Sequence, residues 1–354
     1  WDVPVRTDEG LGAEGWRDLV GEGGLVVDGV LGTGLRGAPR ERQGAAIENI
    51  NALGCWVLSI DVPSGIDAAR GAVPGEAVQA AVTIAFGAPK LGSLLHPARS
   101  FAGRLIAVEI AFPPWNSKAV AARVVTPAWA QARLPQRESD THKNAVGRVL
   151  VVAGQRGMAG AAVLVVRAAL SAGAGLVRIC SAPENREIVQ SAVPEAIYVD
   201  PGDPGALKEA LEQCDAVGLG PGLGTGALAQ DLAATVATGP LRPLVVDADA
   251  LNLSSEGKLD LASLAPTRAI LATPHAGEMA RLLGTDTGTV QSDRIAALQR
   301  AVEAHGTALL LKGAPSLVGA PGSEVLVDCQ GSSDLAAAGM GDALTGVCAT
   351  LMAQ

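Results

Sequence analysis

The chain has 354 residues, which exceeds the usual size of a single hydrophobic core and predicts about two domains. Apolar residues make up 48% of the chain and charged residues 18%, a balance that predicts packed globular structure and argues against intrinsic disorder. The net charge of −9, without basic clusters that carry interleaved aromatic residues, argues against a nucleic-acid partner, although glycine-rich amides can still bind an anionic nucleotide.

The first part of the chain contains short apolar runs that predict parallel strands. They cover 25–31, 55–61, 80–86 and 104–110, and the first three end near Gly, Asp or Pro. Residues 40–54 lie between the first two runs and predict a helix. This alternation is typical of a doubly wound α/β sheet.

A polar, proline-bearing stretch at 113–145 interrupts this pattern and predicts a domain boundary near residue 120. Beyond it the alternation of strands and helices resumes, with helices predicted at 159–173 and 228–237. The strands predicted there are 148–153, 176–180, 215–219, 243–247, 269–272 and 308–312. No internal repeat is evident. We therefore predict two α/β domains, 1–120 and 121–354.

Two loops of the first domain carry candidate polar groups. The segment 26–39 contains a GxGxxG spacing after a strand, but Ala38 and Pro39 follow it, so the glycines do not open a good helix and a Rossmann dinucleotide site is a weak interpretation. If this loop and the loop at 59–67 share one sheet edge, Asp28, Asp61 and Ser64 form a small oxygen-lined site for a cation or another ligand.

Several loops of the second domain follow predicted strands. GLGPGLGTG at 218–226 allows close approach of a ligand, and VVDADALNL at 245–253 sets carboxylates at a strand's carboxyl end, where open α/β sheets bind ligands. Asp247 and Asp249 are interpreted only as helix caps. The segment 154–179 predicts a glycine-rich turn and a tightly packed helix, and His275, taken alone, slightly favours a structural role.

The strongest single motif is AGMGDALTG at 338–346. Gly339 and Gly341 let backbone amides close around a phosphoryl oxygen at a helix start, and Asp342 is placed to take a proton from a substrate hydroxyl. The alternative is a plain turn in which Asp342 caps the helix. Upstream, Lys312 and Ser316 lie in a loop that suits the phosphates of a nucleotide, although a solvated lysine is the more common explanation of such a segment.

Targeting signals are not evident. Five scattered cysteines without a CxxC pair predict neither a disulfide framework nor a zinc site. The apolar runs are too short to cross a membrane, and the start of the chain lacks a signal peptide's plan, so a cytoplasmic protein is predicted. Because the chain opens with Trp1 rather than Met and stops at Gln354 in an apolar helical stretch, we expect that both ends have been cut.

Seven motifs, taken in order, resemble one family. They are HKNAVGRVLVVAG, GMAGAA, GPGLG, DADALN, TPHAGEM, LKGAPS and AGMGDALTG. Throughout 126–354 the chain resembles the NAD(P)H-hydrate dehydratase domain, which implies a ribokinase-like fold. Residues 25–112, with DGVLGTGLRG, SIDVPSGID and FGAPKLGSLLHP, resemble the later part of the NAD(P)H-hydrate epimerase domain that bacteria fuse in front.

The dehydratase resemblance implies roles for individual residues. Asp342 is the catalytic residue and contacts the hydrated nicotinamide, and Ala161, Gly222 and His275 map to further substrate contacts. The nucleotide is held by Lys312, Gly313, Ala314, Pro315, Ser316 and Gly341. In the bacterial family ADP is the phosphoryl donor, with ATP as the alternative, magnesium is the metal, and the hydroxyl is phosphorylated before it leaves. The substrate is the S-form of hydrated NADH or NADPH, and a homo-oligomer is implied.

The epimerase resemblance implies a potassium ion near Asp28 and Ser64, and Asp61 as a catalytic residue beside the reacting hydrate. The substrate runs along Gly32, Thr33, Gly34, Leu35, Arg36, Gly37 and Ala38. The family's Asn- and Gly-rich phosphate loop is missing upstream of Asp28, so the resemblance predicts an incomplete epimerase domain.

The sequence also departs from the dehydratase pattern. Asn144 stands where relatives carry Gly, and the end at Gln354 predicts a dehydratase domain that is truncated at its carboxyl end. Two alternatives remain open from the residues. One is a small-molecule kinase of the same fold, of the thiazole or hydroxymethylpyrimidine type, and the other is a nucleotide-binding module without catalysis.

Overall fold

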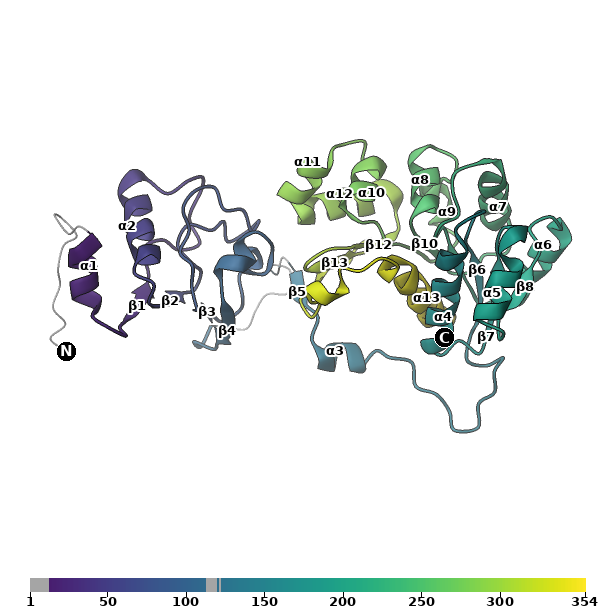
Figure 1. The fold of residues 1–354 in the computed structure, drawn as a ribbon, viewed down its shortest axis with the longest axis horizontal. Coiled ribbons are helices and arrows are strands. Elements are labelled where there is room, and N and C mark those ends of the chain that lie inside the picture. Colours follow the sequence, from purple (N-terminus) through teal and green to yellow (C-terminus); the bar gives the residue numbers. More distant parts are fainter. Residues whose placement is uncertain (1–12, 113–119, 121) are drawn as a thin grey trace. The chain divides into compact units, whose positions relative to one another are not determined.

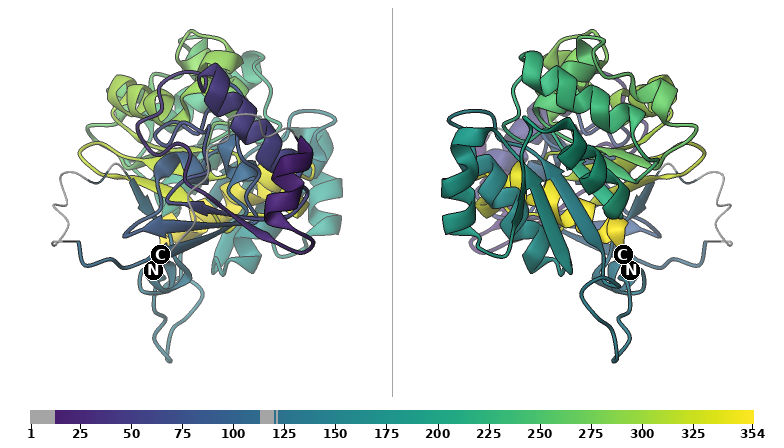
Figure 2. Two further views of the ribbon diagram at one scale, coloured as in Figure 1. Left: turned by 90° about the vertical axis from the view of Figure 1, so that its left-hand side faces the viewer. Right: turned by 90° about the vertical axis from the view of Figure 1, so that its right-hand side faces the viewer.

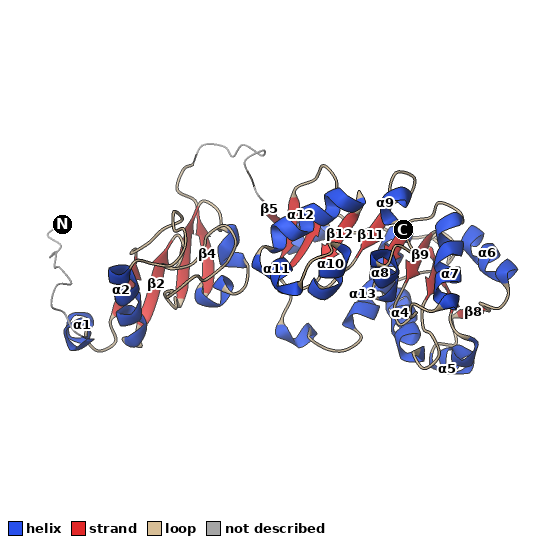
Figure 3. Ribbon diagram, turned by 90° about the horizontal axis from the view of Figure 1, so that it is seen from above, coloured by secondary structure: helices blue, strands red, loops and turns tan. Residues whose placement is uncertain are grey.

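The fold is taken from a computed structural model that describes residues 13–112, 120 and 122–354. The chain separates into two compact units, Trp1–Ala121 and Ala122–Gln354. Both are built on sheets of mainly parallel strands, which confirms the predicted α/β class (Figures 1 and 3). The start of the chain, where no signal peptide is predicted, and most of 113–121, beside the predicted boundary, lie outside the described residues.

Four parallel strands form the sheet of the first unit. In sheet order they are β1 (Leu25–Asp28), β2 (Trp56–Ile60), β3 (Val82–Phe86) and β4 (Arg104–Val108). The helical elements are α1 (Ala13–Val20), α2 (Glu41–Ala52), and the 3-10 turns η1 (Leu91–Leu94) and η2 (Ala98–Phe101). Helix α2 buries Ile47 and Ile50 in a cluster with Val57 of β2. Asp28 is in register with Ser59, so the loops that follow β1 and β2 begin at the same sheet edge.

Ten strands form the sheet of the second unit, in the order β5, β14, β13, β12, β11, β10, β9, β6, β7, β8. Their bounds are β5 (Ala122–Val124), β6 (Arg148–Val152), β7 (Leu176–Cys180), β8 (Ile197–Val199), β9 (Ala216–Leu219), β10 (Leu244–Val246), β11 (Ile270–Ala272), β12 (Ala308–Leu311), β13 (Ser316–Gly319) and β14 (Val325–Asp328). All neighbours are parallel except β13, which is antiparallel to both β12 and β14.

Helices cover both faces of this sheet (Figures 1 and 2). They are α3 (Pro127–Gln131), α4 (Ala159–Ser171), η4 (Pro183–Asn185), α5 (Arg186–Ala192), α6 (Pro204–Gln213), α7 (Ala227–Thr238), α8 (Asp249–Ser255), α9 (Leu261–Leu264), α10 (Ala276–Leu282), α11 (Thr287–Ser292), α12 (Arg294–His305), η5 (Ser333–Leu335) and α13 (Met340–Ala353). Helix α12 packs on β12 and β13, and α13 packs on β6, β9 and β10. Among the described residues, none of the helices is long and apolar enough to span a bilayer.

Among the described elements of the second unit, α13 and α4 share an extensive helix–helix contact. A Cβ on Gly346 would lie 2.2 Å from the carbonyl oxygen of Val165, so only a glycine permits this approach. The hydroxyl of Thr350 donates to the carbonyl of Ala169 across the same contact at 3.1 Å. The pair thereby fixes the start of α13 relative to the sheet.

The register of the central strands gathers several loops at one edge. Val246, the last residue of β10, is opposite Leu219 at the end of β9 and Ala272 at the end of β11. Strand β12 continues the parallel series and ends at Leu311. The loops after β9, β10, β11 and β12 therefore begin side by side at the carboxyl edge, where open α/β sheets bind ligands.

Candidate functional site

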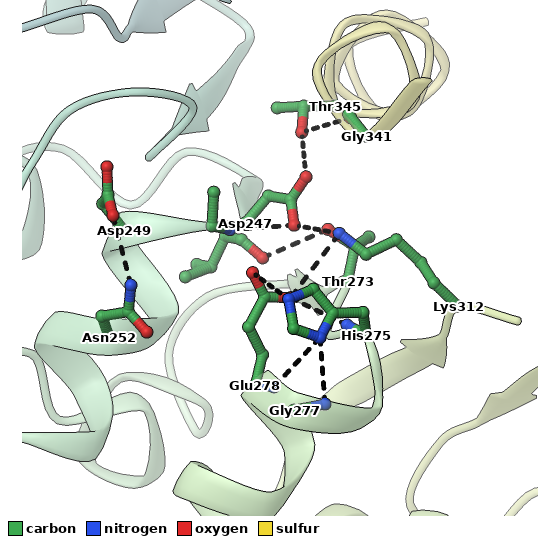
Figure 4. Close-up of polar contacts among 12 residues, drawn as sticks. Asp247, Asp249, Asn252, Thr273, His275, Gly277, Glu278, Lys312, Gly341 and Thr345 are labelled. Carbon is green, nitrogen blue, oxygen red and sulfur yellow. Dashed lines mark hydrogen bonds and ion pairs between the residues drawn. The ribbon is translucent and has the colours of Figure 1, made fainter. Parts of the chain in front are cut away.

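Lys312 extends from the end of β12 toward two buried carboxylates (Figure 4). Its Nζ lies 2.7 Å from Oδ1 of Asp247 and 3.6 Å from Oε2 of Glu278. Asp247 is only 1% exposed, and its other oxygen, Oδ2, accepts a hydrogen bond from the Thr345 hydroxyl at 2.9 Å. A buried carboxylate is costly unless it is paired, so the ammonium and the hydroxyl compensate the charge of Asp247.

The glycine-rich turn before α13 reaches the same place. Gly339 caps the helix in the left-handed conformation, with φ of +87°. A Cβ on Gly341 would lie 3.5 Å from Nζ of Lys312 and 3.6 Å from Oδ2 of Asp247. The lysine loop and the start of α13 thus converge, and the first-turn amides of a helix, which lack partners within it, stand next to an ammonium.

Asp342 lies in the first turn of α13, and Gly339 occupies the capping position, so the interpretation of Asp342 as the helix cap is wrong. Burial raises the pKa of Asp342 above the ordinary 3.8, the charge of Asp247 raises it further, and Lys312 opposes the shift. A partly buried carboxyl with a raised pKa beside a glycine-rich turn has the properties of a general base.

The lysine loop joins β12 to β13. Gly313 adopts a φ of +149°, which favours glycine, and Ser316 is already the first residue of β13. The Ser316 hydroxyl donates to the carbonyl of Gly313 at 3.1 Å. Gly313 and Ala314 are exposed, whereas Pro315 is buried, so the tip of the loop is accessible to a ligand.

His275 caps α10 through its side chain. Its Nδ1 accepts hydrogen bonds from the amides of Gly277 and Glu278 at 2.9 and 3.3 Å, and Oε2 of Glu278 accepts from the His275 amide at 2.8 Å. His275 therefore has a structural role as a helix cap, as predicted when this residue was taken alone. The same reciprocal cap turns Glu278 toward Lys312, and His275 keeps 55% of its side chain exposed.

Gly222 and Ala161, which the resemblance assigns to the substrate, are neighbours. A Cβ on Gly222 would lie 2.9 Å from Cβ of Ala161. Two residues further on, the amide of Gly224 donates to Oδ2 of Asp249 at 2.7 Å. Beside this loop lies an open polar pocket of about 750 Å³, whose lining includes Gly224, Asp249 and Arg281.

The structure corrects the interpretation of one residue. Asp247 lies at the centre of the site, where it contacts Lys312 and Thr345, whereas its place after a strand predicted only a helix cap. No sequence signal marks Asp247 as a site residue. Ala248, which follows it, adopts an unfavourable positive φ of +49°, and the Asp247 carboxylate accepts a hydrogen bond from Lys312. Glu278 and Thr345 also join the site without having been singled out.

In the first unit, Asp28 and Ser64 are brought together. The Ser64 hydroxyl and amide donate to Oδ1 and Oδ2 of Asp28 at 2.5 and 2.9 Å, and the hydroxyl of Ser59 donates to Oδ2 at 2.7 Å. Both Asp28 and Ser64 are buried. The glycine loop that follows, from Gly32 to Ala38, is largely exposed, and α2 begins only at Glu41, so these glycines do not open a helix.

Asp61 forms an ion pair that the sequence did not reveal. It adopts a left-handed φ of +69°, and its Oδ1 accepts hydrogen bonds from Nζ of Lys90 and from the amide of Phe86. Lys90 also donates to the Phe86 carbonyl at 3.0 Å. A positive φ at a non-glycine residue costs free energy, so this carboxylate is held in an unfavourable conformation by its neighbours. The only signal for Lys90 was its place in FGAPKLGSLLHP.

The described residues contain no group of three or more His, Cys, Asp or Glu side chains that gathers to hold a metal ion. Mg²⁺ commonly binds through one or two carboxylates together with the phosphates of a nucleotide. Asp247 and Asp342 are carboxylates of that kind beside the glycine-rich turn before α13. The residues present therefore fit a magnesium ion that arrives with its nucleotide.

The fold and the convergent turn place the second unit in the ribokinase-like class. A ribokinase-like superfamily protein of Enterococcus faecalis superposes with a TM-score of 0.61 and 27% identity, covering 69% of this chain and 83% of that chain. An ADP/ATP-dependent NAD(P)H-hydrate dehydratase of Bacillus subtilis, co-crystallized with ATP/Mg²⁺, gives a TM-score of 0.58 and 27% identity over 67% and 83%.

Family models and relatives agree with this class. Residues 149–354 match the NAD(P)H-hydrate dehydratase family, and residues 6–92 match the YjeF-related protein N-terminus. Bifunctional NAD(P)H-hydrate repair enzymes of Moorella thermoacetica and Escherichia coli are 38% and 35% identical over 93% and 100% of this chain. The chain spans 64% and 69% of their lengths. It belongs to the NAD(P)H-hydrate repair enzyme family.

Proposed function

We propose that the second unit dehydrates the S-form of hydrated NADH or NADPH and uses ADP or ATP as the phosphoryl donor. The observation that carries this proposal is the convergence of Gly341 and Asp342 with Lys312 and Asp247 at one sheet edge. The substrate is inferred from the names of the related enzymes, and the groups that would act on it are inferred from the geometry of the site.

In this proposal the nucleotide lies against the lysine loop and the first-turn amides of α13. Lys312 and these amides attract phosphate, while Asp342 takes the proton from the substrate hydroxyl as the hydroxyl oxygen attacks the terminal phosphorus. The bond between that phosphorus and its bridging oxygen breaks, so AMP leaves when ADP is the donor and ADP leaves when ATP is the donor. The phosphate ester then leaves as inorganic phosphate, and loss of a ring proton restores the nicotinamide double bond. Phosphate is a better leaving group than hydroxide, so the nucleotide makes the elimination feasible.

The charges at the site support a role for magnesium. The carboxylates of Asp247, Glu278 and Asp342 face one ammonium, that of Lys312, so the local charge is negative even though a phosphate would bind there. Mg²⁺ would supply the missing positive charge to the phosphates when it is bound. Asp247 and Asp342 are the side chains that would face the ion.

The substrate would approach from the side of Gly222 and Ala161, with His275 at the rim. The adjacency of Gly222 and Ala161 supports this placement, as does the polar pocket beside Gly224, which is large enough for part of a dinucleotide.

We also propose that the first unit belongs to an epimerase domain, in which Asp61 acts on the hydrate and a potassium ion lies near Asp28 and Ser64. We further propose that the protein is cytoplasmic and forms a homo-oligomer.

The direct test is restoration of the nicotinamide absorbance from chemically prepared S-hydrate. The full chain is incubated with the hydrate and magnesium, together with ADP, ATP or no nucleotide. We expect recovery of the absorbance that depends on a nucleotide, with stoichiometric release of phosphate. A sample without the protein is the control for spontaneous dehydration.

Other outcomes distinguish the alternatives. If the nucleotide is consumed with a thiazole or hydroxymethylpyrimidine substrate and the hydrate shows no recovery of nicotinamide absorbance, the chain is a small-molecule kinase and this proposal is wrong. Tight nucleotide binding without turnover of any of these substrates would indicate a non-catalytic module. Light scattering coupled to size exclusion measures the oligomeric state independently.

A further inference from the structure

Arg294, the first residue of α12, is a charged side chain that lies beneath the lysine loop. It is only 6% exposed, and burial lowers the pKa of its guanidinium. Nη1 donates to the carbonyl of Pro315 at 2.7 Å, and Nη2 donates to the carbonyls of Lys312 and Leu311 at 3.3 and 3.4 Å. This buried cation is therefore bound to the backbone of the loop at both of its ends.

The contact is close enough to determine the conformation of the loop. A Cβ on Gly313 would lie 2.5 Å from Nη2 of Arg294, so the guanidinium packs directly on the loop backbone. The carbonyls of Lys312 and Pro315 turn toward Arg294, while the side chain of Lys312 extends to Asp247 (Figure 4). Hydrogen bonds from a charged donor are among the stronger ones, so the loop is fixed before any ligand arrives.

We propose that Arg294 is a positioning residue for nucleotide binding: it holds the loop from Lys312 to Ser316 in the conformation that binds the phosphates. The proposal rests on the proposed nucleotide site and assigns a role to a side chain that does not reach the ligand. Among the residues that the structure describes, none is a hydrogen-bond partner of Nε of Arg294. The side chain thus leaves one donor buried and unsatisfied while its two terminal nitrogens hold the loop.

Arg268 provides a matched control. It is 5% exposed, and burial lowers the pKa of its guanidinium. Its Nε likewise lacks a hydrogen-bond partner within the described part of the chain. Nη1 and Nη2 donate to the carbonyls of Val236 and Pro240 at 3.0 and 2.6 Å. Arg268 precedes β11, whereas the lysine loop follows β12, so the two arginines serve opposite edges of the sheet.

The experiment compares Arg294→Met and Arg294→Lys with Arg268→Met in the full chain. Calorimetric titration measures the Kd for ADP with magnesium, and thermal unfolding without nucleotide measures the Tm. We expect Arg294→Met to raise the Kd about tenfold, since it removes charged hydrogen bonds from the binding loop. Arg268→Met should lower the Tm to a similar extent and change the Kd less than about twofold, within the additivity of distant sites.

Arg294→Lys retains a donor of the same charge and should restore part of the affinity. In the hydrate assay, Arg294→Met should raise KM for ADP more than it lowers kcat, because the catalytic carboxylate is untouched. Equal Kd values for ADP in Arg294→Met and Arg268→Met would overturn the proposal. If Arg294→Met does not fold, Arg294→Lys takes its place, and a Kd for ADP equal to that of the unmutated chain would then overturn the proposal. Binding of ADP by the unmutated chain without dehydration would refute the proposed function alone, and lack of ADP binding would refute both.

Discussion

Asp247 connects the two halves of the site through its two oxygens. Oδ1 faces the ammonium of Lys312, and Oδ2 accepts from the hydroxyl of Thr345 in α13. A change at Asp247 would therefore affect both the loop that follows β12 and the helix that carries Asp342. The carboxylate also raises the pKa of Asp342, so it acts on the proposed base through its charge.

Replacement of Asp342 by Asn should abolish dehydration and leave ADP affinity within about twofold, because the amide groups at the start of α13 remain in place. The raised pKa means that the Asp342 charge opposes folding at neutral pH, so the Tm of the variant should stay equal or rise. Turnover assays, titration and thermal unfolding measure the three quantities. Lys312→Ala is the contrasting variant, which should weaken ADP binding. Unchanged turnover in Asp342→Asn would remove this residue from the mechanism.

The dependence of kcat on pH should show an acid limb that belongs to Asp342. A general base works only when it is ionised, and the ionised fraction falls as the pH drops through the pKa of the folded state. Because that pKa is raised, kcat should be lost at a pH above the ordinary carboxyl value of 3.8. Rates measured across this range, with unfolding monitored at each pH, test the expectation. An acid limb at or below 3.8 would assign the base to another group.

A site residue could be predicted from the sequence only when it belongs to a recognisable local motif. Gly341, Asp342 and Lys312 stand in glycine-rich segments whose backbone geometry has a recognisable purpose. Asp247 and Arg294 do not, because their roles depend on strand register and on how α12 packs beneath a loop far away in sequence. Such contacts are fixed by tertiary structure, and the sequence around these two residues shows only an ordinary cap and an ordinary helix start.

At the scale of elements, the predicted apolar runs agree closely with the buried strands. Strand β7 occupies the predicted residues, and β6, β9, β10, β11 and β12 differ by only one or two residues at their ends. Four strands were not predicted, namely β5, β8, β13 and β14. They have three or four residues each, and β13 (SLVG) and β14 (VLVD) contain only two and three consecutive apolar residues. Apolar runs of this length are too short to show the periodicity of a strand.

Substitution of Gly346 by Leu should destabilise the second unit. The added side chain would overlap the backbone of α4 near Val165, and overpacking of a core commonly costs about 1–3 kcal/mol. Thermal unfolding should show a lower Tm for this variant. Gly160→Leu is the matched control in α4, since Gly160 is exposed and has open space where a Cβ would lie. A Tm equal to that of the control would show that the two helices can separate without cost.

At the scale of the whole molecule, each unit has a core of its own. Val151, Val165 and Ala349 belong to the core of the second unit, whereas Ile47 and Val57 belong to the first. All the groups of the proposed nucleotide site lie in the second unit. Binding of a nucleotide should therefore stabilise one core and not the other.

Calorimetric unfolding should resolve this difference. ADP at about one hundred times its Kd stabilises the unit that binds it by about 2.7 kcal/mol, which corresponds to a rise of roughly 5–10 °C in the Tm of a domain of this size. We expect that rise in the transition of the second unit and no change in that of the first. A scan in which both transitions move together would show that the units unfold as one.

Strand β5 determines where the second unit can be separated from the first. It begins at Ala122, the first residue of that unit, and pairs in parallel with β14. A genetic cut after Val124 would strip this strand away and leave the backbone amides and carbonyls of β14 facing solvent, a template for self-association between copies. Any dissection of the two units into separate polypeptides must therefore place its junction ahead of Ala122.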